Sequence, residues 1–158
     1  MIQLTIMFLV NGDEVLLAMK KRGFGQGRWN GVGGKVEKGE TVQQSVIREC
    51  QEEIDVTPTN HQKIADIYYD EQHQGVREKL HVHAFLCTKW QGKPIESEEM
   101  APKWFKISKL PYKEMWDDDP YWLPQIFTGQ KLKCKFTLDE NDKVSHKEVR
   151  EVARFNND

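Results

Sequence analysis

The chain has 158 residues, with 23 lysine and arginine residues against 25 aspartate and glutamate residues and a formal net charge of -2. This balance argues against a protein that binds nucleic acid polymers through a basic surface, and a content of 38% hydrophobic residues argues against disorder. Three widely spaced cysteines without a C-x-x-C pair argue against a disulfide framework and a zinc ribbon. We therefore expect one globular domain over residues 1–158 in a reducing compartment, the cytoplasm.

An apolar segment opens the chain at residues 2–10 and has the composition of a buried strand. No lysine or arginine precedes it, and it is far shorter than the ~20 residues that cross a bilayer, which argues against a signal peptide or a membrane anchor. Asn11-Gly12 is a strong signal for a tight turn, and residues 15–19 supply a partner strand. We expect a β-hairpin here and no membrane partner.

A basic, glycine-rich segment follows the hairpin at residues 20–35 and holds six of the chain's 11 glycines. Neither the G-x-G-x-x-G fingerprint nor the G-x-x-x-x-G-K-[ST] loop fits it, because Arg28, Trp29 and Val36 stand at required positions. Flexible linkers are rich in serine and poor in tryptophan and arginine, whereas glycine lets a backbone approach a ligand closely. The segment is therefore predicted to be a binding loop.

Residues 41–54 show helical periodicity, because apolar residues recur at steps of three and four. On a neighbouring face, Glu49, Glu52 and Glu53 project from about one turn. A solvated acidic face that pairs with Arg48 is the alternative, but carboxylate oxygens are also the ligands that Mg²⁺ and Mn²⁺ prefer. Because a basic loop directly precedes the helix, we predict a metal-assisted phosphate site.

The rest of the chain predicts a mixed sheet and one further helix. That helix is expected to have Asp119 as its N-cap and Pro120 at its first position, and to end at Gly129. His81 and His83 share one strand face and could form a metal pair, but no third ligand is evident nearby, so no role is assigned to them. The remaining predicted elements are strands at 64–69, 80–88 and 104–107, a polar loop at 70–79, and two strands in the tail at 133–154.

The spacing from Gly34 to Glu40, and on to the run Arg48-Glu49-Cys50-Gln51-Glu52-Glu53-Ile54-Asp55-Val56, resembles the Nudix box, G-x5-E-x7-R-E-U-x-E-E-x-G-U. Asp55 stands where the family has glycine, and Cys50 stands where it has a larger aliphatic residue. The resemblance implies an α+β Nudix fold, with a mixed β-sheet sandwiched between helices in an α/β/α arrangement. It also implies hydrolysis of a nucleoside diphosphate linked to a further group.

The same resemblance assigns the chemistry to the helix and leaves open which carboxylate acts as the base. The implied metal is Mg²⁺, for which Mn²⁺ could substitute, and Arg48 and Glu40 are expected to brace the loop against the helix. The implied catalytic residues are Glu49, Glu52 and Glu53. The implied metal ligands are these three glutamates, the Gly33 carbonyl and, from outside the box, Glu99.

Segments 20–31, 94–100 and 115–122 further resemble the MutT-type Nudix hydrolases that act on oxidised purine nucleoside triphosphates. The implied substrate-binding residues are Thr5, Lys20, Phe24, Asn30, Val32, Gly33, Gly34, Lys35, Tyr69, Trp116, Asp117, Asp118 and Asp119. Tyr69 falls where the MutT-type hydrolase that this chain resembles has phenylalanine, so the tyrosine adds a hydroxyl to the pocket. For residues 117–119, a helix N-cap with solvated neighbours is the alternative, but the flanking tryptophans favour a pocket. Two adjacent buried carboxylates repel each other, so one is expected to carry a proton.

The resemblance implies a monomer that converts purine nucleoside triphosphates such as 8-oxo-dGTP and 2-hydroxy-dATP to the monophosphate and pyrophosphate, and so sanitises the nucleotide pool. One alternative keeps the fold but changes the substrate to a dinucleoside polyphosphate or a nucleotide sugar. Another is a catalytically silent module that binds nucleotides without cleaving them. Because every carboxylate of the motif is present, an active enzyme is expected.

Overall fold

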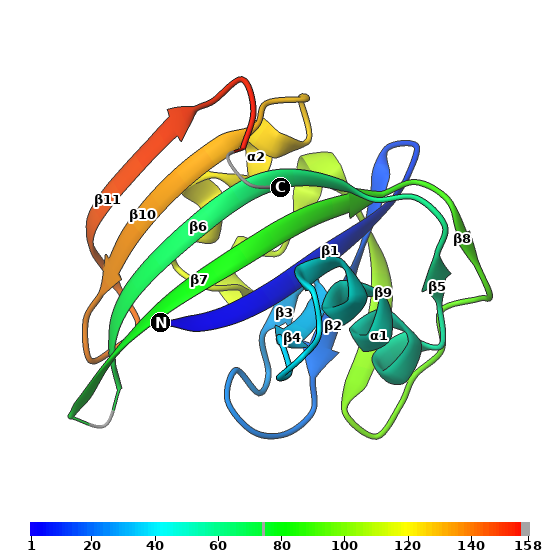
Figure 1. The fold of residues 1–158 in the computed structure, drawn as a ribbon, viewed down its shortest axis with the longest axis horizontal. Helices are drawn as coiled ribbons and strands as arrows, with labels where there is room; N and C mark the ends of the chain where they lie inside the picture. The colour runs from blue at the N-terminus through cyan, green and yellow to red at the C-terminus, as the bar shows by residue number, and fades with distance from the viewer. Residues whose placement is uncertain (74, 156–158) are drawn as a thin grey trace.

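The computed structural model describes residues 1–73 and 75–155, and it is built around a mixed sheet with helix α1 on one face and helix α2 on the other (Figure 1). The strand order is β11-β10-β6-β7-β1-β2-β3, with β4 paired to β1 and β9 paired to β2. The pairs β1–β7 and β6–β10 are parallel and the others antiparallel, which confirms the predicted α+β sandwich. The elements are β1 (Ile2–Asn11), β2 (Glu14–Lys20), β3 (Trp29–Asn30), β4 (Val32–Lys35), α1 (Val42–Ile54), β5 (Thr57–Pro58), β6 (Gln62–His73), β7 (Val76–Cys87), β8 (Trp90–Gln91), β9 (Met100–Lys106), three 3-10 helices η1 (Ile107–Lys109), η2 (Tyr112–Glu114) and η3 (Asp119–Tyr121), α2 (Leu123–Ile126), β10 (Leu132–Leu138) and β11 (Val144–Glu151).

Strand β1 lies inside the sheet. One of its sides pairs with β7, and the other pairs with β4 along its first part and with β2 at its end. Its end pairs with β2 through Val10 and Val15, which confirms the predicted hairpin. Its earlier part, from Leu4 to Met7, pairs with β4. The glycine-rich loop that follows β2 therefore ends beside the central strand, where Val32 pairs with Met7. No helix among residues 1–73 and 75–155 is long and apolar enough to cross a membrane.

The alternation of side chains along β1 produces two separate cores. Met7 and Leu9 lie in a cluster with Val46, Cys50 and Ile54 of α1. Neighbouring residues along the strand point to the opposite face, where they join a second cluster with the residues of α2. The sheet is thus buried on both faces near β1, as a sandwich requires.

Helix α1 follows the prediction closely. Thr41 caps it, because its hydroxyl accepts a hydrogen bond from the Gln44 N–H while the Gln44 side chain accepts one from the Thr41 N–H. Such a capping box contributes about 1 kcal/mol. Asp55 ends the helix in the left-handed region, with φ 58°, the conformation for which glycine is the usual residue. The sequence-based boundaries of this helix are confirmed.

The predicted loop at residues 70–79 is wrong over most of its length. Strands β6 and β7 continue as one long antiparallel ribbon, in which Asp70 pairs with Lys79 and Gln72 with Arg77. Arg77 Nε also donates a hydrogen bond of 2.7 Å to Asp70 Oδ1. Polar side chains on both faces suit a ribbon that extends beyond the core, and residue 74 lies outside the described residues.

The predicted helix from Asp119 to Gly129 is also only partly right. The segment folds as the 3-10 turn η3 followed by the single turn α2, so no continuous helix forms there. Asp118, not Asp119, is the N-cap of this 3-10 turn, and its side chain makes no capping hydrogen bond; Asp119 follows it as a buried residue. The two predicted strands of the tail are confirmed as β10 and β11, and the predicted strand at 104–107 begins earlier, at Met100.

Candidate active site

A cavity of about 210 Å³ opens where strands β1, β2, β6 and β7 meet the glycine-rich loop and the segment before α2. Its lining combines residues that are far apart in the sequence. The sequence-predicted residues that line it are Thr5, Lys20, Phe24, Asn30, Gly33, Gly34, Tyr69, Trp116, Asp118 and Asp119. The fold therefore brings most of the predicted substrate-binding set to one cavity.

One wall of this cavity is a stack of flat side chains. The rings of Phe24 and Trp116 lie 5.2 Å apart between centroids, and the Arg28 guanidinium lies 4.2 Å from the Trp116 ring centroid. Arg28 also approaches Asp142, at 3.5 Å, in the turn between β10 and β11. Gly25 has φ +84° and passes so close to Trp116 that an added Cβ would touch the indole. The wall offers aromatic and cationic faces on which a planar base can stack.

The floor of the cavity holds two neighbouring carboxylates, Asp118 and Asp119, which are 1% and 3% exposed. Asp118 Oδ2 accepts a hydrogen bond of 2.6 Å from the Tyr69 hydroxyl and one of 3.0 Å from Trp122 Nε1. Asp119 Oδ2 is buried, and no described residue forms a hydrogen bond with it. The two acids therefore sit in unequal surroundings.

Burial raises the pKa of both carboxyls. The pKa of Asp119 rises well above its ordinary value, because the neighbouring Asp118 charge adds to the effect of burial. The donors Tyr69 and Trp122 oppose the rise at Asp118, since they stabilise its ionised form. Tyr69 remains a donor, because burial and the Asp118 charge raise the pKa of its hydroxyl. The arrangement favours an ionised acceptor, Asp118, beside a protonated donor, Asp119.

A second group of carboxylates lies at the end of the site formed by α1. Glu53 is 8% exposed, and its Oε2 is buried without a hydrogen-bond partner among the described residues. Burial, together with a hydrogen bond and charge repulsion from Glu49 and the charge of Glu99, raises the pKa of Glu53 to about 9. The carboxylates of Glu49, Glu53 and Glu99 thus repel one another, and the nearby cations do not neutralise them. A group of carboxylate oxygens of this kind suits a divalent cation such as Mg²⁺.

Arg48 holds this group of carboxylates in place. Its Nε and Nη2 donate to Glu40 at 2.7 and 2.8 Å, and its Nη1 donates to Glu49 and Glu52 at 3.1 Å each. Its Nη2 also donates to the Lys35 carbonyl at 3.3 Å. The hydrogen bonds from Arg48 lower the pKa of Glu40 to about 2. The structure therefore supports the predicted bracing role of Arg48 and Glu40.

Glu52 has a side chain that is 60% exposed, so it lies further out than Glu49 and Glu53.

Strand β4 connects the two ends of the site. A Cβ on Gly34 would fall 2.6 Å from Glu49 Oε1, and a Cβ on Gly33 would fall 1.8 Å from the Thr5 carbonyl oxygen. Only glycine lets the strand pass this close to both the helix carboxylate and β1. The same two glycines line the cavity, together with Lys20, whose charge acts on Glu53. A ligand seated in the cavity can therefore extend directly toward the helix carboxylates.

Three members of the predicted substrate-binding set do not line the cavity. Val32 is buried in the core beneath α1, and Lys35 is exposed. Asp117 turns toward the tail hairpin, where its Oδ2 accepts a hydrogen bond of 2.8 Å from the Val144 N–H. Its charge still contributes to the raised pKa of Asp118. Sequence patterns place neighbouring residues together but do not say to which side each one turns.

Sequence reasoning missed several residues of the cavity. The sequence indicates Arg28 only as part of the basic, glycine-rich loop, and it indicates Trp122 and Met100 only as members of matching segments. Glu71 carries no local signal, because its position in the cavity depends on how β6 pairs. The indole of Trp122 could have been suspected, since a buried tryptophan N–H needs an acceptor and carboxylates precede it in the sequence.

Comparison with known proteins agrees with this geometry. The model of the NUDIX domain matches residues 2–126. The chain is 38% identical over 151 residues to the oxidized purine nucleoside triphosphate hydrolase of Mus musculus, covering 96% of each chain. It is 40% identical over 149 residues to the protein of the same name from Danio rerio, covering 94% of each. The crystal structure of a MutT protein from Bacillus halodurans has the same fold, with a TM-score of 0.80 at 22% identity over 94% of this chain and 97% of that one. The chain therefore belongs to the Nudix family.

Proposed function

We propose that the protein hydrolyses oxidised purine nucleoside triphosphates, such as 8-oxo-dGTP and 2-hydroxy-dATP, to the monophosphate and pyrophosphate. The observation that carries this proposal is the pairing of Asp118 with Asp119 at the floor of a cavity that leads to the helix carboxylates. The names of the mouse and zebrafish relatives support it, since both are oxidized purine nucleoside triphosphate hydrolases. We further propose that the protein acts as a monomer.

The base is recognised by hydrogen bonds on one edge and by stacking on its faces. Protonated Asp119 donates to an exocyclic carbonyl oxygen or a ring nitrogen, ionised Asp118 accepts from a ring N–H, and the Asn30 amide offers both functions. Trp116 and Phe24 cover the plane of the base. If the two acids exchange the proton, the same floor accommodates an edge with the opposite order of donor and acceptor.

The triphosphate extends along Lys20 and the Gly33–Gly34 backbone toward α1. Nudix hydrolases use a divalent metal ion, and here we propose Mg²⁺, with Mn²⁺ as a substitute, held by Glu49, Glu53 and Glu99 with contributions from Glu52 and the Gly33 carbonyl. When bound, the metal neutralises charge on the phosphate oxygens and lowers the pKa of coordinated water.

The protein's own groups account for positioning at this end of the site. Arg48 keeps the Glu49 carboxylate turned toward Gly34, and Lys20 adds positive charge on the side of the cavity. Glu49 or Glu53 orients the attacking water and accepts its proton, since both carboxylates are held in a largely buried position.

A kinetic comparison of 8-oxo-dGTP, 2-hydroxy-dATP and dGTP tests the proposal, with release of pyrophosphate as the readout and Glu53→Gln as the inactive control. We expect kcat/KM for both oxidised nucleotides to exceed that for dGTP. Equal values for dGTP and 8-oxo-dGTP would contradict a sanitising role. Cleavage of a nucleotide sugar or a dinucleoside polyphosphate, without pyrophosphate release from any triphosphate, would point to a different Nudix substrate.

A further inference from the structure

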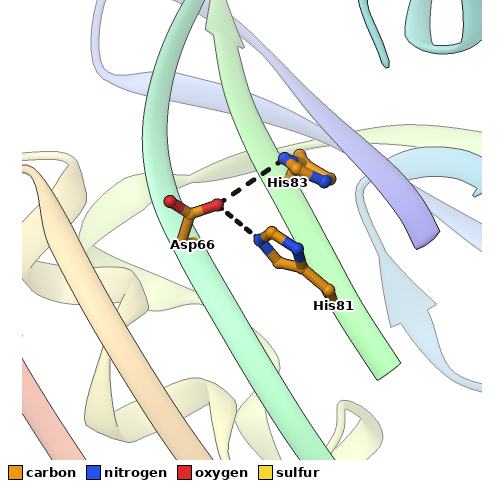
Figure 2. Close-up of side chains that lie close together, drawn as sticks. All are labelled: Asp66, His81 and His83. Atoms are coloured by element: carbon orange, nitrogen blue, oxygen red, sulfur yellow. Dashed lines mark hydrogen bonds and ion pairs between the residues drawn. The ribbon is translucent and has the colours of Figure 1, made fainter. Parts of the chain in front are cut away.

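A cluster of potential metal ligands lies outside the cavity, on the face of the sheet that α1 covers in part. Figure 2 shows His81 and His83 pointing from β7 toward Asp66 on the neighbouring strand β6. One ligand atom from each residue lies within 4.8 Å of the other two. The antiparallel register pairs Asp66 with His83, so the third ligand that the sequence did not reveal comes from the adjacent strand. None of these residues lines the nucleotide cavity.

The cluster already binds a cation, the ammonium group of Lys63. Lys63 Nζ lies 2.7 Å from Asp66 Oδ1 and 2.9 Å from His83 Nδ1, and its side chain is only 8% exposed. An ammonium group can only donate, so His83 Nδ1 is the unprotonated nitrogen and directs its lone pair at the positive charge. Two protein groups thus present lone pairs to one buried cation.

The ring of His83 is already held in an orientation that metal binding uses. His83 Nε2 donates a hydrogen bond of 2.7 Å to Gln3 Oε1, which leaves Nδ1 free of a proton. Ligand histidines in proteins commonly donate their second N–H to an oxygen in this way, which fixes the tautomer and the ring orientation. His81 Nε2 lies 2.6 Å from Asp66 Oδ1, and its ring stacks on Tyr68 with centroids 4.3 Å apart.

The acid of the cluster is ionised. Burial tends to raise the pKa of Asp66, but hydrogen bonds from His81 and Lys63 outweigh it and hold the pKa below its ordinary value. Asp66 is 8% exposed, so its charge is poorly solvated and depends on these partners. A metal ion would offer such a carboxylate a stronger partner than an ammonium group does.

We propose that Asp66, His81 and His83 form a binding site for a transition-metal ion such as Zn²⁺, which replaces the ammonium group of Lys63. Two imidazole nitrogens and one carboxylate oxygen form a ligand set that Zn²⁺ accepts, with water completing the shell. Mg²⁺ prefers oxygen ligands alone, so the cluster and the glutamates of α1 select different ions by their chemistry. On binding, the His81 Nε2 proton is released to solvent and Nδ1 takes up a proton in its place, so the ring stays neutral and Nε2 presents its lone pair, while the lysine side chain turns away.

The bound ion would cross-link strands that also carry the catalytic end of the molecule. The paired residues Asp66, His83, Thr5 and Gly34 form one row across β6, β7, β1 and β4. Glu49 lies against Gly34 at the end of this row. Zn²⁺ at the cluster therefore stabilises the strands that support the active site without occupying it, and we expect a higher unfolding temperature when Zn²⁺ is bound.

Calorimetric titration of the metal-free protein with Zn²⁺, in excess Mg²⁺ to occupy the carboxylate site, tests this proposal. We expect one Zn²⁺ to bind, and Co²⁺ at the same site to give a visible absorption spectrum typical of nitrogen ligands. Lys63→Met removes the competing charge and should tighten binding by about tenfold or more. His81→Ala removes a ligand and should weaken binding by about 100-fold or more, since even a lost outer partner of a ligand costs ~10–100-fold.

Controls separate this site from the rest of the molecule. His146→Ala changes an exposed histidine on β11 and should leave the Zn²⁺ affinity unchanged. Glu53→Gln should also leave it unchanged, because that side chain belongs to the other site. If wild type and Lys63→Met both lack the nitrogen-ligand Co²⁺ spectrum, or if His81→Ala binds Zn²⁺ as tightly as wild type, the proposal is wrong and the cluster is only an ion pair that joins β6 to β7. Zn²⁺ binding is measured without nucleotide, so its outcome is independent of the proposed hydrolysis.

Discussion

The two ends of the site each hold a pair of neighbouring carboxylates with little exposure to solvent, and each end stabilises its pair in a different way. At the base end, Asp118 receives two neutral donors, and Asp119 is favoured in its protonated form. At the helix end, Glu49 is held by the charged Arg48, while Glu53 keeps an oxygen without a partner among the described residues. Asp118 and Asp119 can therefore form specific hydrogen bonds with a neutral base. Glu49 and Glu53 are not fully neutralised, so they can bind a cation. The partners of a buried carboxylate therefore decide which part of a nucleotide it recognises.

The largest effect is expected at the helix end. Glu53→Gln removes the most buried of the helix carboxylates and should lower kcat by about 10³-fold, since metal stabilisation of phosphate charge is worth several kcal/mol. Glu52→Gln is the matched control, because Glu52 is exposed and already paired with Arg48, and its loss should be about tenfold. Steady-state kinetics with 8-oxo-dGTP measures both. Equal losses for the two variants would show that burial does not rank these carboxylates.

A smaller effect is expected at the base end. Asp118→Asn replaces the acceptor of the Tyr69 and Trp122 hydrogen bonds and should lower kcat/KM for 8-oxo-dGTP by about 10²-fold, through the loss of one charge-assisted hydrogen bond. Asp117→Asn is the control, because that side chain turns away from the cavity and should leave kcat/KM nearly unchanged. If Asp118→Asn hydrolysed 8-oxo-dGTP and 2-hydroxy-dATP as efficiently as wild type, the proton-sharing pair would be refuted.

The pH dependence distinguishes the proton of Asp119 from the other groups. Burial raises the pKa of Asp119, so the folded protein keeps a proton that the unfolded chain, with an ordinary value of 3.8, has already released. The associated stability is complete below pH 3.8 and is lost as the pH rises through the folded pKa. As the pH rises through the folded pKa of Asp119, its carboxyl loses the proton that it donates to the base. KM for 8-oxo-dGTP should then rise about tenfold. Asp119→Asn should show a flatter KM profile, and an unchanged profile would assign the effect to another group.

The smallest effect is expected for Tyr69→Phe. The change removes one hydrogen bond to Asp118 and leaves the ring, so the free energy of unfolding should fall by about 1 kcal/mol. Without this donor the pKa of Asp118 should rise further, which should shift the preference between 8-oxo-dGTP and 2-hydroxy-dATP by a few-fold. Denaturant unfolding and the ratio of the two kcat/KM values provide the measurements. An unchanged ratio would limit the Tyr69 hydroxyl to a structural role.

The sequence predicts those features that depend on nearby residues. Helix α1 and the hairpin at Asn11 are local, and their boundaries follow from periodicity and turn chemistry. The long ribbon of β6 and β7 was not predicted, because its polar residues look like a loop until they are paired across strands. Likewise, the contact of Asp66 with His83 depends on strand register, which no local pattern reports.

The candidate site follows the same rule. The motif spacing predicted the carboxylates of α1, since a helix fixes the relation between residues three and four apart. The direction of Asp117 and the stacking of Arg28 on Trp116 were not predictable, because both depend on the packing of the tail hairpin against the loop. Residue types predicted the chemistry, but long-range packing decides which side chains take part in it.

The parallel pairing of β1 with β7 has a consequence for how the chain folds. The register pairs Ile2 with Leu80 and Leu9 with Cys87, so β1 cannot form this pairing until β7, far along the chain, is available. Closing so large a loop costs entropy before any contact offsets it, whereas the β6–β7 ribbon closes locally. During synthesis the apolar first strand therefore emerges before β7 exists, and burial of the active-site floor is a late step in folding.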